Sequence, residues 1–133
     1  MKRRSYLKAV IAAAAGLRGA AQEPDQQARN PIVLDVDLSV TPAREQEMLH
    51  NFHTIFKPAA VKFPGYIDVK MLKLGSALQG AAPAGVNYRF QLTYQSEEQR
   101  RKWVASEPHI KAWPTIEKTL QSKDYTVLLF DSV

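Results

Sequence analysis

The clearest pattern in the chain is an alternation of apolar and polar residues in two segments. Residues 32–40 place Ile, Leu, Val, Leu and Val at every second position, and residues 86–94 do the same with Val, Tyr, Phe, Leu and Tyr. A period of two predicts strands with one apolar and one polar face. Two further strands are predicted: residues 66–74, with Ile67, Val69 and Met71 on one face, and residues 125–130, which are apolar on both faces.

A first helix is predicted directly after residue 40. Thr41 and Pro42 indicate its start, with Thr41 as the N-cap and Pro42 in the first helical position. The helix is expected to run to about Lys57, where Pro58 disturbs or ends it. Its predicted buried stripe consists of Met48, Leu49, Phe52, Ile55 and Phe56.

A second helical segment is predicted after the strand at 86–94. Ser96 and Gln99 form a capping box, which predicts a helix start at about Glu97. The sequence Ser-Glu-Pro at 106–108 indicates a break and a new start. The buried stripe expected after the break is Ile110, Trp113, Ile116 and Leu120.

The predicted order is strand, helix, strand, strand, helix, strand. This order indicates an α+β fold of the ferredoxin-like βαββαβ kind over residues 32–133, with a four-stranded antiparallel sheet and two helices on one face. The chain has 133 residues, which allows one such domain and little more.

The first 21 residues have the three parts of a signal peptide: a basic start, an alanine-rich apolar stretch and small residues ending at Ala21. The string Arg3-Arg4-x-aromatic-Leu-Lys resembles the twin-arginine motif, which a bacterial export receptor reads. We therefore expect residues 1–21 to direct export to the periplasm or the medium, and residues 22–31 to form a flexible tether. The alternative is a basic N-terminus that is retained.

Charge is concentrated in the same leader. The chain has 18 basic and 13 acidic residues, and the excess of five is accounted for by Lys2, Arg3, Arg4, Lys8 and Arg18. The rest of the chain carries no excess of positive charge, so we expect no nucleic-acid partner. Its apolar runs are too short for a stable membrane span, and a chain without cysteine cannot form disulfides or thiolate metal sites.

The polar face of the predicted sheet favours a second copy of this chain as a partner. Asp37 and Arg89 lie on strands that we expect to be neighbours, so they can pair across this face. The last strand adds apolar side chains to it. Twofold dimers are the commonest closed assembly, so we expect a homodimer with Asp37 and Arg89 in the dimer face. The alternative is a monomer with a solvated sheet face.

Several short motifs occur together in an order that resembles one known family. They are Val40-Thr41-Pro42, Phe63-Pro64-Gly65-Tyr66, Ser96-Glu97-Glu98 and the segment from Trp103 to Trp113. Residues 31–133 thereby resemble the antibiotic-biosynthesis-monooxygenase-like (ABM) family of dimeric α+β barrels.

That resemblance implies a ligand pocket between the helices and the sheet of each subunit. The family includes cofactor-independent oxygenases acting on polycyclic phenols and quinones, haem-degrading enzymes, and proteins without a known reaction. Trp103 matches a tryptophan that shapes the pocket in haem-degrading members. Their haem-ligating histidine falls on Trp113, however, and an indole cannot ligate iron. The resemblance therefore implies an oxygenase-like domain without a cofactor rather than a haem-degrading one.

His109 is the candidate catalytic residue. Neutral imidazole is a common general base near neutral pH. His109 lies four residues before Trp113, on the same side of the predicted helix. The alternative is a structural role for His109 at the helix start after Pro108.

Aromatic side chains can line a flat apolar pocket or simply fill the core. The candidate pocket residues are Trp103, Trp113, His53, Phe52 and Tyr88. Glu47, His50 and His53 have the residue types of a metal site. Because steps of three residues spread them around the helix axis and along it, we expect no metal there.

These observations favour an exported domain that acts on an aromatic or quinone-like small molecule, as a cofactor-independent monooxygenase. A non-catalytic ligand-binding module and a purely structural dimer are the alternatives.

Overall fold

The computed structural model describes residues 30–133. The predictions for the signal peptide at 1–21, including Arg3 and Arg4, and for most of the tether at 22–31 lie outside this part of the chain. The strands are β1 (Ile32–Leu38), β2 (Tyr66–Lys73), β3 (Tyr88–Tyr94) and β4 (Thr126–Asp131). The helical elements are η1 (Pro42–Arg44), α2 (Glu45–Asn51), η2 (Phe52–Phe56), α3 (Lys57–Val61), α4 (Glu97–Ala105) and α5 (Glu107–Glu117).

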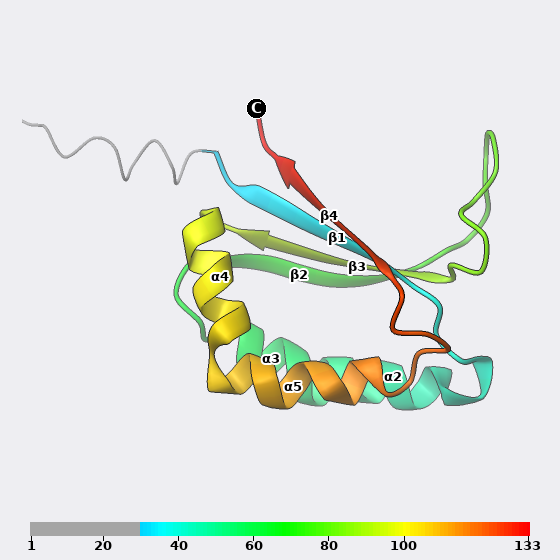
Figure 1. Cartoon of the computed structure of the whole chain (residues 1–133), viewed down its shortest axis with the longest axis horizontal. Helices are drawn as coiled ribbons and strands as arrows, with labels where there is room; N and C mark the ends of the chain where they lie inside the picture. Colours follow the sequence, from blue (N-terminus) through cyan, green and yellow to red (C-terminus); the bar gives the residue numbers. More distant parts are fainter. Residues whose placement is uncertain (1–29) are drawn as a thin grey trace, which may run out of the picture. The chain divides into compact units, whose positions relative to one another are not determined.

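The four strands form one antiparallel sheet in the order β2-β3-β1-β4. The helices α2, α3 and α5 run along one face of this sheet, and α4 stands at one end of the helical layer (Figure 1). Within residues 30–133 no helix lies on the opposite face of the sheet. The predicted ferredoxin-like α+β fold is confirmed. None of the helices among residues 30–133 combines the length and the apolar character needed to cross a bilayer.

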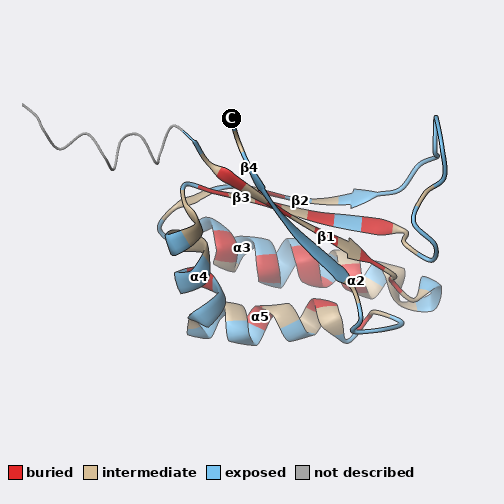
Figure 2. Cartoon of the chain, turned by 45° about the horizontal axis from the view of Figure 1, so that its top comes forward, coloured by how far each residue is buried: buried red, intermediate tan, exposed pale blue. Residues whose placement is uncertain are grey.

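The core lies between the two central strands and the helices. Alternate residues of β1 and β3 point toward the helical layer and are buried: Ile32, Leu34, Val36, Leu38, Tyr88, Phe90, Leu92 and Tyr94. The edge strand β4 differs, because every one of its residues is exposed (Figure 2). The helical layer covers the centre of the sheet and leaves β4 open on both faces.

The first helix starts where the sequence predicts but continues past its predicted end. Thr41 makes no side-chain capping bond; instead its carbonyl accepts the Arg44 amide at 2.8 Å in a tight first turn. Pro58 does not end the helix, which continues to Val61 through the π-helical turn η2, where the Lys57 amide donates to Phe52 five residues earlier. Proline lacks the amide for an ordinary helical bond and crowds the preceding turn, and the wider π-turn relieves both problems.

Two residues of the predicted helix stripes, Ile55 and Ile110, and one residue of a predicted strand face, Ile67, are exposed. Ile55, in the π-turn, is 41% exposed, and Ile110 is 60% exposed because α5 buries Ala112 and Ile116 instead. Ile67 is 44% exposed because an irregularity between Tyr66 and Asp68 shifts the register of β2. The predicted breaks at Ser96 and Ser106 are confirmed: their hydroxyls accept the amides of Gln99 and His109 at 3.2 and 3.4 Å.

Candidate functional site

A cavity of about 160 Å³ lies between the sheet and the helices α4 and α5. From the sheet it is lined by Leu34 and Val36 of β1, Phe90 and Leu92 of β3, and Val127 of β4. From the helical side it is lined by Phe56, Arg100, Trp103, Val104, His109 and Trp113, with Tyr125 before β4 completing the wall. Its volume is close to the ~150 Å³ of an engineered apolar cavity that binds benzene. The cavity is partly open to solvent, and its volume fits one aromatic ring, with a larger ligand extending outward.

His109 is the titratable group most enclosed by aromatic rings in this cavity. Its imidazole lies 5.2 Å from the Trp103 ring and 6.1 Å from the Phe56 ring, both edge-on, and stacks on Trp113 at 6.4 Å. Burial, and secondly the positive charge of Arg100, lower the pKa of His109 below its usual value of 6.5. The imidazole is therefore neutral at pH 7. No hydrogen bond within residues 30–133 involves the imidazole of His109, which leaves both ring nitrogens available to a ligand.

Trp103 is the largest fully buried side chain of the wall. Its indole Nε1–H has no hydrogen-bond acceptor among the described residues. An unpaired buried donor costs about 1–3 kcal/mol. Trp103 is 0% exposed and its Nε1 is itself buried, so this residue contributes a packed ring to the wall rather than an accessible donor.

Arg100 brings a positive charge to the cavity from α4. Its side chain is 19% exposed, and Nε and Nη2 both donate to Glu97, at 2.7 Å each. The hydrogen bond to Glu97 raises the pKa of Arg100 above its usual value. The guanidinium is thus fixed at the pocket wall by a pair on its own helix.

A second polar group closes the other side of the cavity. The Tyr125 hydroxyl accepts the Trp113 Nε1–H at 3.0 Å and donates to Glu117 at 2.8 Å. Burial, and secondly the hydrogen bond to Glu117, raise the pKa of Tyr125. This chain fixes the ring plane of Trp113, on which His109 stacks.

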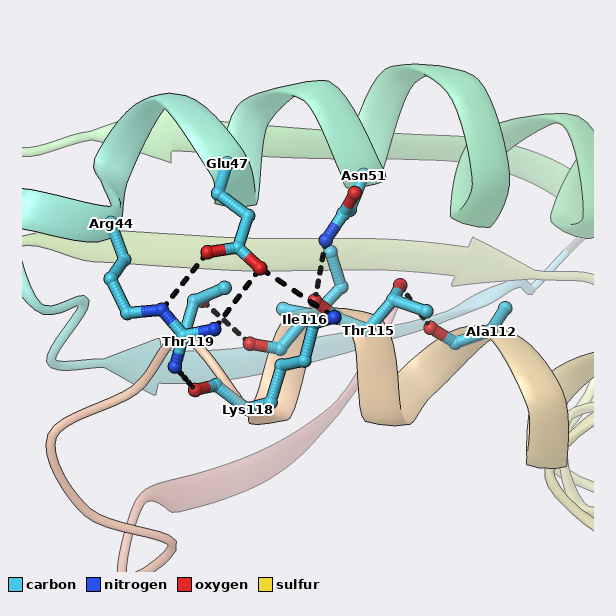
Figure 3. A network of polar contacts seen from close by, with 8 residues as sticks. All are labelled: Arg44, Glu47, Asn51, Ala112, Thr115, Ile116, Lys118 and Thr119. Atoms are coloured by element: carbon cyan, nitrogen blue, oxygen red, sulfur yellow. Dashed lines mark hydrogen bonds and ion pairs between the residues drawn. The ribbon is translucent and has the colours of Figure 1, made fainter.

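The C-terminal end of α5 is anchored by polar contacts from the first helical segment (Figure 3). Asn51, which is buried, donates from Nδ2 to the Thr115 carbonyl at 2.9 Å. That carbonyl needs an outside donor because the Thr119 amide bonds to Ile116 instead. Arg44 binds the Lys118 carbonyl and pairs with Glu47. These contacts set the position of α5, and with it the depth at which His109 and Trp113 enter the cavity.

The structure brings three of the predicted site residues together. Trp103, Trp113 and His109 all line the cavity. Phe52, His53 and Tyr88 do not line it. Phe52 is buried deeper in the core, against Phe56 and Phe90.

His53 and Tyr88 lie elsewhere for separate reasons. His53 is exposed on η2, with only its ring edge against Phe52. Tyr88 is buried at the far end of β3, where its hydroxyl binds Glu45, which also pairs with Lys73. Burial, and secondly the bond to Glu45, raise the pKa of Tyr88 to about 12.

Two wall residues, Arg100 and Tyr125, are not among the predicted site residues. Arg100 precedes Trp103 and Val104 by three and four residues, which places all three on one helix face. That spacing could have revealed Arg100. No comparable signal exists for Tyr125, because it follows an irregular segment and its position depends on the tertiary fold.

The other predicted clusters lie outside the cavity. On the open face of the sheet, Arg89 donates to Asp37 at 2.7 and 3.2 Å, as expected for neighbouring strands. Glu47 pairs with Arg44 and Lys118. Among residues 30–133, no group of three or more His, Asp or Glu side chains is placed to hold a metal ion.

Comparisons with known proteins identify the fold only. No protein-family model and no curated protein matches the sequence. Solved structures do match. A candidate antibiotic biosynthesis monooxygenase from Caulobacter crescentus is 17% identical over 78% of this chain and 91% of its own, with a TM-score of 0.61. The chain shares the fold of these proteins.

Two further matches show how varied those proteins are. Hydroxynitrile lyase from Passiflora edulis is 14% identical over 77% of this chain and 94% of its own, with a TM-score of 0.63. A dimeric ferredoxin-like protein of unknown function from Jannaschia sp. is 14% identical over 77% and 98%, with a TM-score of 0.61. One fold here carries different chemistries, so the function must be argued from the site.

Proposed function

We propose that this chain is an ABM-like domain that binds an aromatic or quinone-like small molecule in the cavity between its sheet and α4–α5. The molecule is oxidised there by a cofactor-independent monooxygenase reaction. The observation that carries the proposal is the imidazole of His109 inside an aromatic cavity, which burial keeps neutral and which makes no hydrogen bond within residues 30–133. Apolar walls with a few polar groups are typical of small-molecule sites.

The residues of the cavity suit a reaction in which the substrate itself reduces oxygen. His109 accepts the proton of a phenolic hydroxyl, and the resulting phenolate is electron-rich enough to react with dioxygen. One oxygen atom enters the ring at a C–H position and the other leaves as water, so a phenol becomes a quinone. The domain orients the ring against the aromatic wall that contains His109 and Trp113.

Binding is tested by thermal shift on the full chain with phenols, hydroquinones, quinones and haem. A ligand that binds only the folded state raises the Tm. We expect a shift with a single-ring or two-ring phenol, followed by oxygen uptake that His109→Gln abolishes. His53→Gln, which changes an exposed histidine, is the matched control and should leave uptake unchanged. No shift with any of these compounds would refute the ligand-binding proposal.

A non-catalytic binding module is the second candidate function. It is favoured by one observation: within the described residues His109 has no carboxylate partner to orient it as a base. In that case phenols bind without oxygen uptake, and His109→Gln changes affinity alone.

We also infer that the chain pairs with a second copy of itself through the face of the sheet that carries no helix. Leu128 and Phe130 of β4 are 47% and 49% exposed and lie on this face next to Asp35 and Val33. A protein with the same fold is described as dimeric, which supports pairing with a second copy but not the choice of face. Light scattering should give twice the chain mass. Leu128→Glu should reduce the measured mass to that of one chain. Leu78→Glu, in an exposed loop, should keep the mass of two chains.

Export by the twin-arginine route belongs to the same proposal and rests on residues 1–21. Replacing Arg3 and Arg4 together by lysine should keep the protein in the cytoplasm of a bacterial host, because the receptor reads the arginine pair. Arg18→Lys, outside the motif, should be exported normally. Equal export of both variants would contradict the proposal.

A further inference from the structure

Two arginines stand next to each other on α4 but face different surroundings. Arg100 lines the cavity and is 19% exposed, whereas Arg101 is 73% exposed and does not line it. Both donate to the same carboxylate of Glu97, at 2.7 and 3.1 Å. The chain thus offers a matched pair of cations, one at the pocket and one in solvent.

The Arg100 guanidinium keeps binding capacity after its pairing with Glu97. Nε and Nη2 are used by Glu97, and no hydrogen bond within residues 30–133 uses Nη1. The single carboxylate of Glu97 is shared by two arginines, so the cluster keeps a positive charge. An arginine fork on a partly buried wall is suited to bind an oxyanion.

The charge is asymmetric across the cavity. Arg100 and His109 come from α4 and the first turn of α5, whereas Tyr125 on the opposite side is hydrogen-bonded to the Glu117 carboxylate. An anionic group on a ligand is attracted to the Arg100 side and repelled from the Glu117 side. His109 is neutral and neither attracts nor repels it strongly.

We propose that Arg100 makes the pocket selective for single-ring aromatic ligands that carry an ionised oxygen, such as an acidic phenol bound as its phenolate. The ligand ring would lie against the aromatic wall that contains His109 and Trp113, with the oxyanion at Nη1 of Arg100. This inference rests on the proposed binding of an aromatic ligand in the cavity. It adds the charge state of the ligand and the residue that selects it. Burial lowers the pKa of His109, so before any proton transfer from a ligand the imidazole is neutral and Arg100 is the charged group of the cavity wall.

The test uses 4-nitrophenol, whose ionisation near neutral pH is followed by its absorbance, and the uncharged isostere 4-nitroanisole. With the full chain, the phenolate should bind roughly 10- to 100-fold more tightly than the anisole, the range of a hydrogen bond to a charged group. The bound phenol should also ionise at a lower pH than the free one, because an adjacent positive charge favours the anion. Equal affinities and an unchanged ionisation would overturn the inference.

Arg100→Gln should remove both the preference and the shift in ionisation, while Arg101→Gln should keep them. Equal losses in the two variants would mean that α4 acts only through its general charge, and would overturn the role of Arg100. If Arg100→Gln does not fold, Glu97→Gln decides. This substitution removes the negative charge next to Arg100 but keeps an oxygen that can accept from its Nε. The preference for the phenolate over the anisole should therefore increase, and an unchanged preference would overturn the inference.

The two probes test the selection by Arg100 and the aromatic pocket separately. If both probes bind with equal affinity, the aromatic pocket stands and only the selection by Arg100 is wrong. If neither probe binds, the aromatic pocket itself is wrong and the inference falls with it.

Discussion

The two ends of α5 are held in different ways. At the C-terminal end, three carbonyls accept hydrogen bonds from the segment 41–51: Thr115 from Asn51, Lys118 from Arg44, and Thr119 from the Thr41 amide. At the N-terminal end, His109 and Trp113 face a cavity, and the neighbours of His109 are aromatic rings.

We infer that the C-terminal end of α5 serves mainly the stability of the domain, and the N-terminal end mainly ligand binding. Polar contacts have strict geometry, so the C-terminal network sets the position of the helix. The aromatic end then does not have to fill its space to hold the helix, and it can leave room for a ligand. Substitutions at the two ends should therefore differ in what they change.

The largest expected effect is at the anchored end. Asn51→Leu removes the donor to Thr115 and leaves that carbonyl without a partner, so the free energy of unfolding should fall by about 1–3 kcal/mol. For a domain of this size each kcal/mol lowers the Tm by roughly 4–8 °C. Calorimetry or circular dichroism measures it.

The control for this substitution is Thr54→Val. Thr54 is exposed and donates to His50 within its own helix, so its loss should stay within about 0.5 kcal/mol. If the Asn51 variant were as stable as the Thr54 variant, the network would not anchor α5.

A smaller effect is expected where the cavity has its own polar contact. Tyr125→Phe leaves Trp113 Nε1 without its acceptor and should lower the free energy of unfolding by about 1 kcal/mol.

The control is Tyr94→Phe. The Tyr94 hydroxyl is buried without a partner among the described residues, so removing it should leave the free energy of unfolding unchanged or raise it. Equal losses in the two variants would contradict this assignment.

The sequence was sufficient for the fold because the periodicity of the strands and the caps at Ser96 and Ser106 are local signals. It was insufficient where tertiary contacts decide. The π-turn before Pro58 rotates Ile55 outward, and the orientation of α5 exposes Ile110 while it buries Ala112. Neither rotation can be read from a regular helical period.

The site residues also divide into those that local sequence patterns predict and those that only tertiary contacts place. Trp103, His109 and Trp113 share two consecutive helices and were predicted together. Phe52 and Tyr88 were grouped with them only as aromatic residues, and the structure places them in the core away from the cavity. Tyr125 lines the cavity because the chain returns to the sheet directly before β4, and no local sequence pattern predicts this position.

The smallest expected effect is a difference in pH dependence at the cavity end. Burial, and secondly Arg100, hold the pKa of His109 below 6.5, so the unfolded chain takes up this proton at a higher pH than the folded chain does. The stability that depends on a neutral His109 is therefore complete above about pH 6.5 and is lost as the pH falls from there toward the folded-state pKa. The Tm measured from about pH 8 to pH 5 should fall less in His109→Gln than in the unchanged protein. His53→Gln, at an exposed site, should keep the original slope. Identical slopes in all three proteins would show that the aromatic end of α5 does not keep His109 neutral, and the two ends of the helix would then differ less than their contacts indicate.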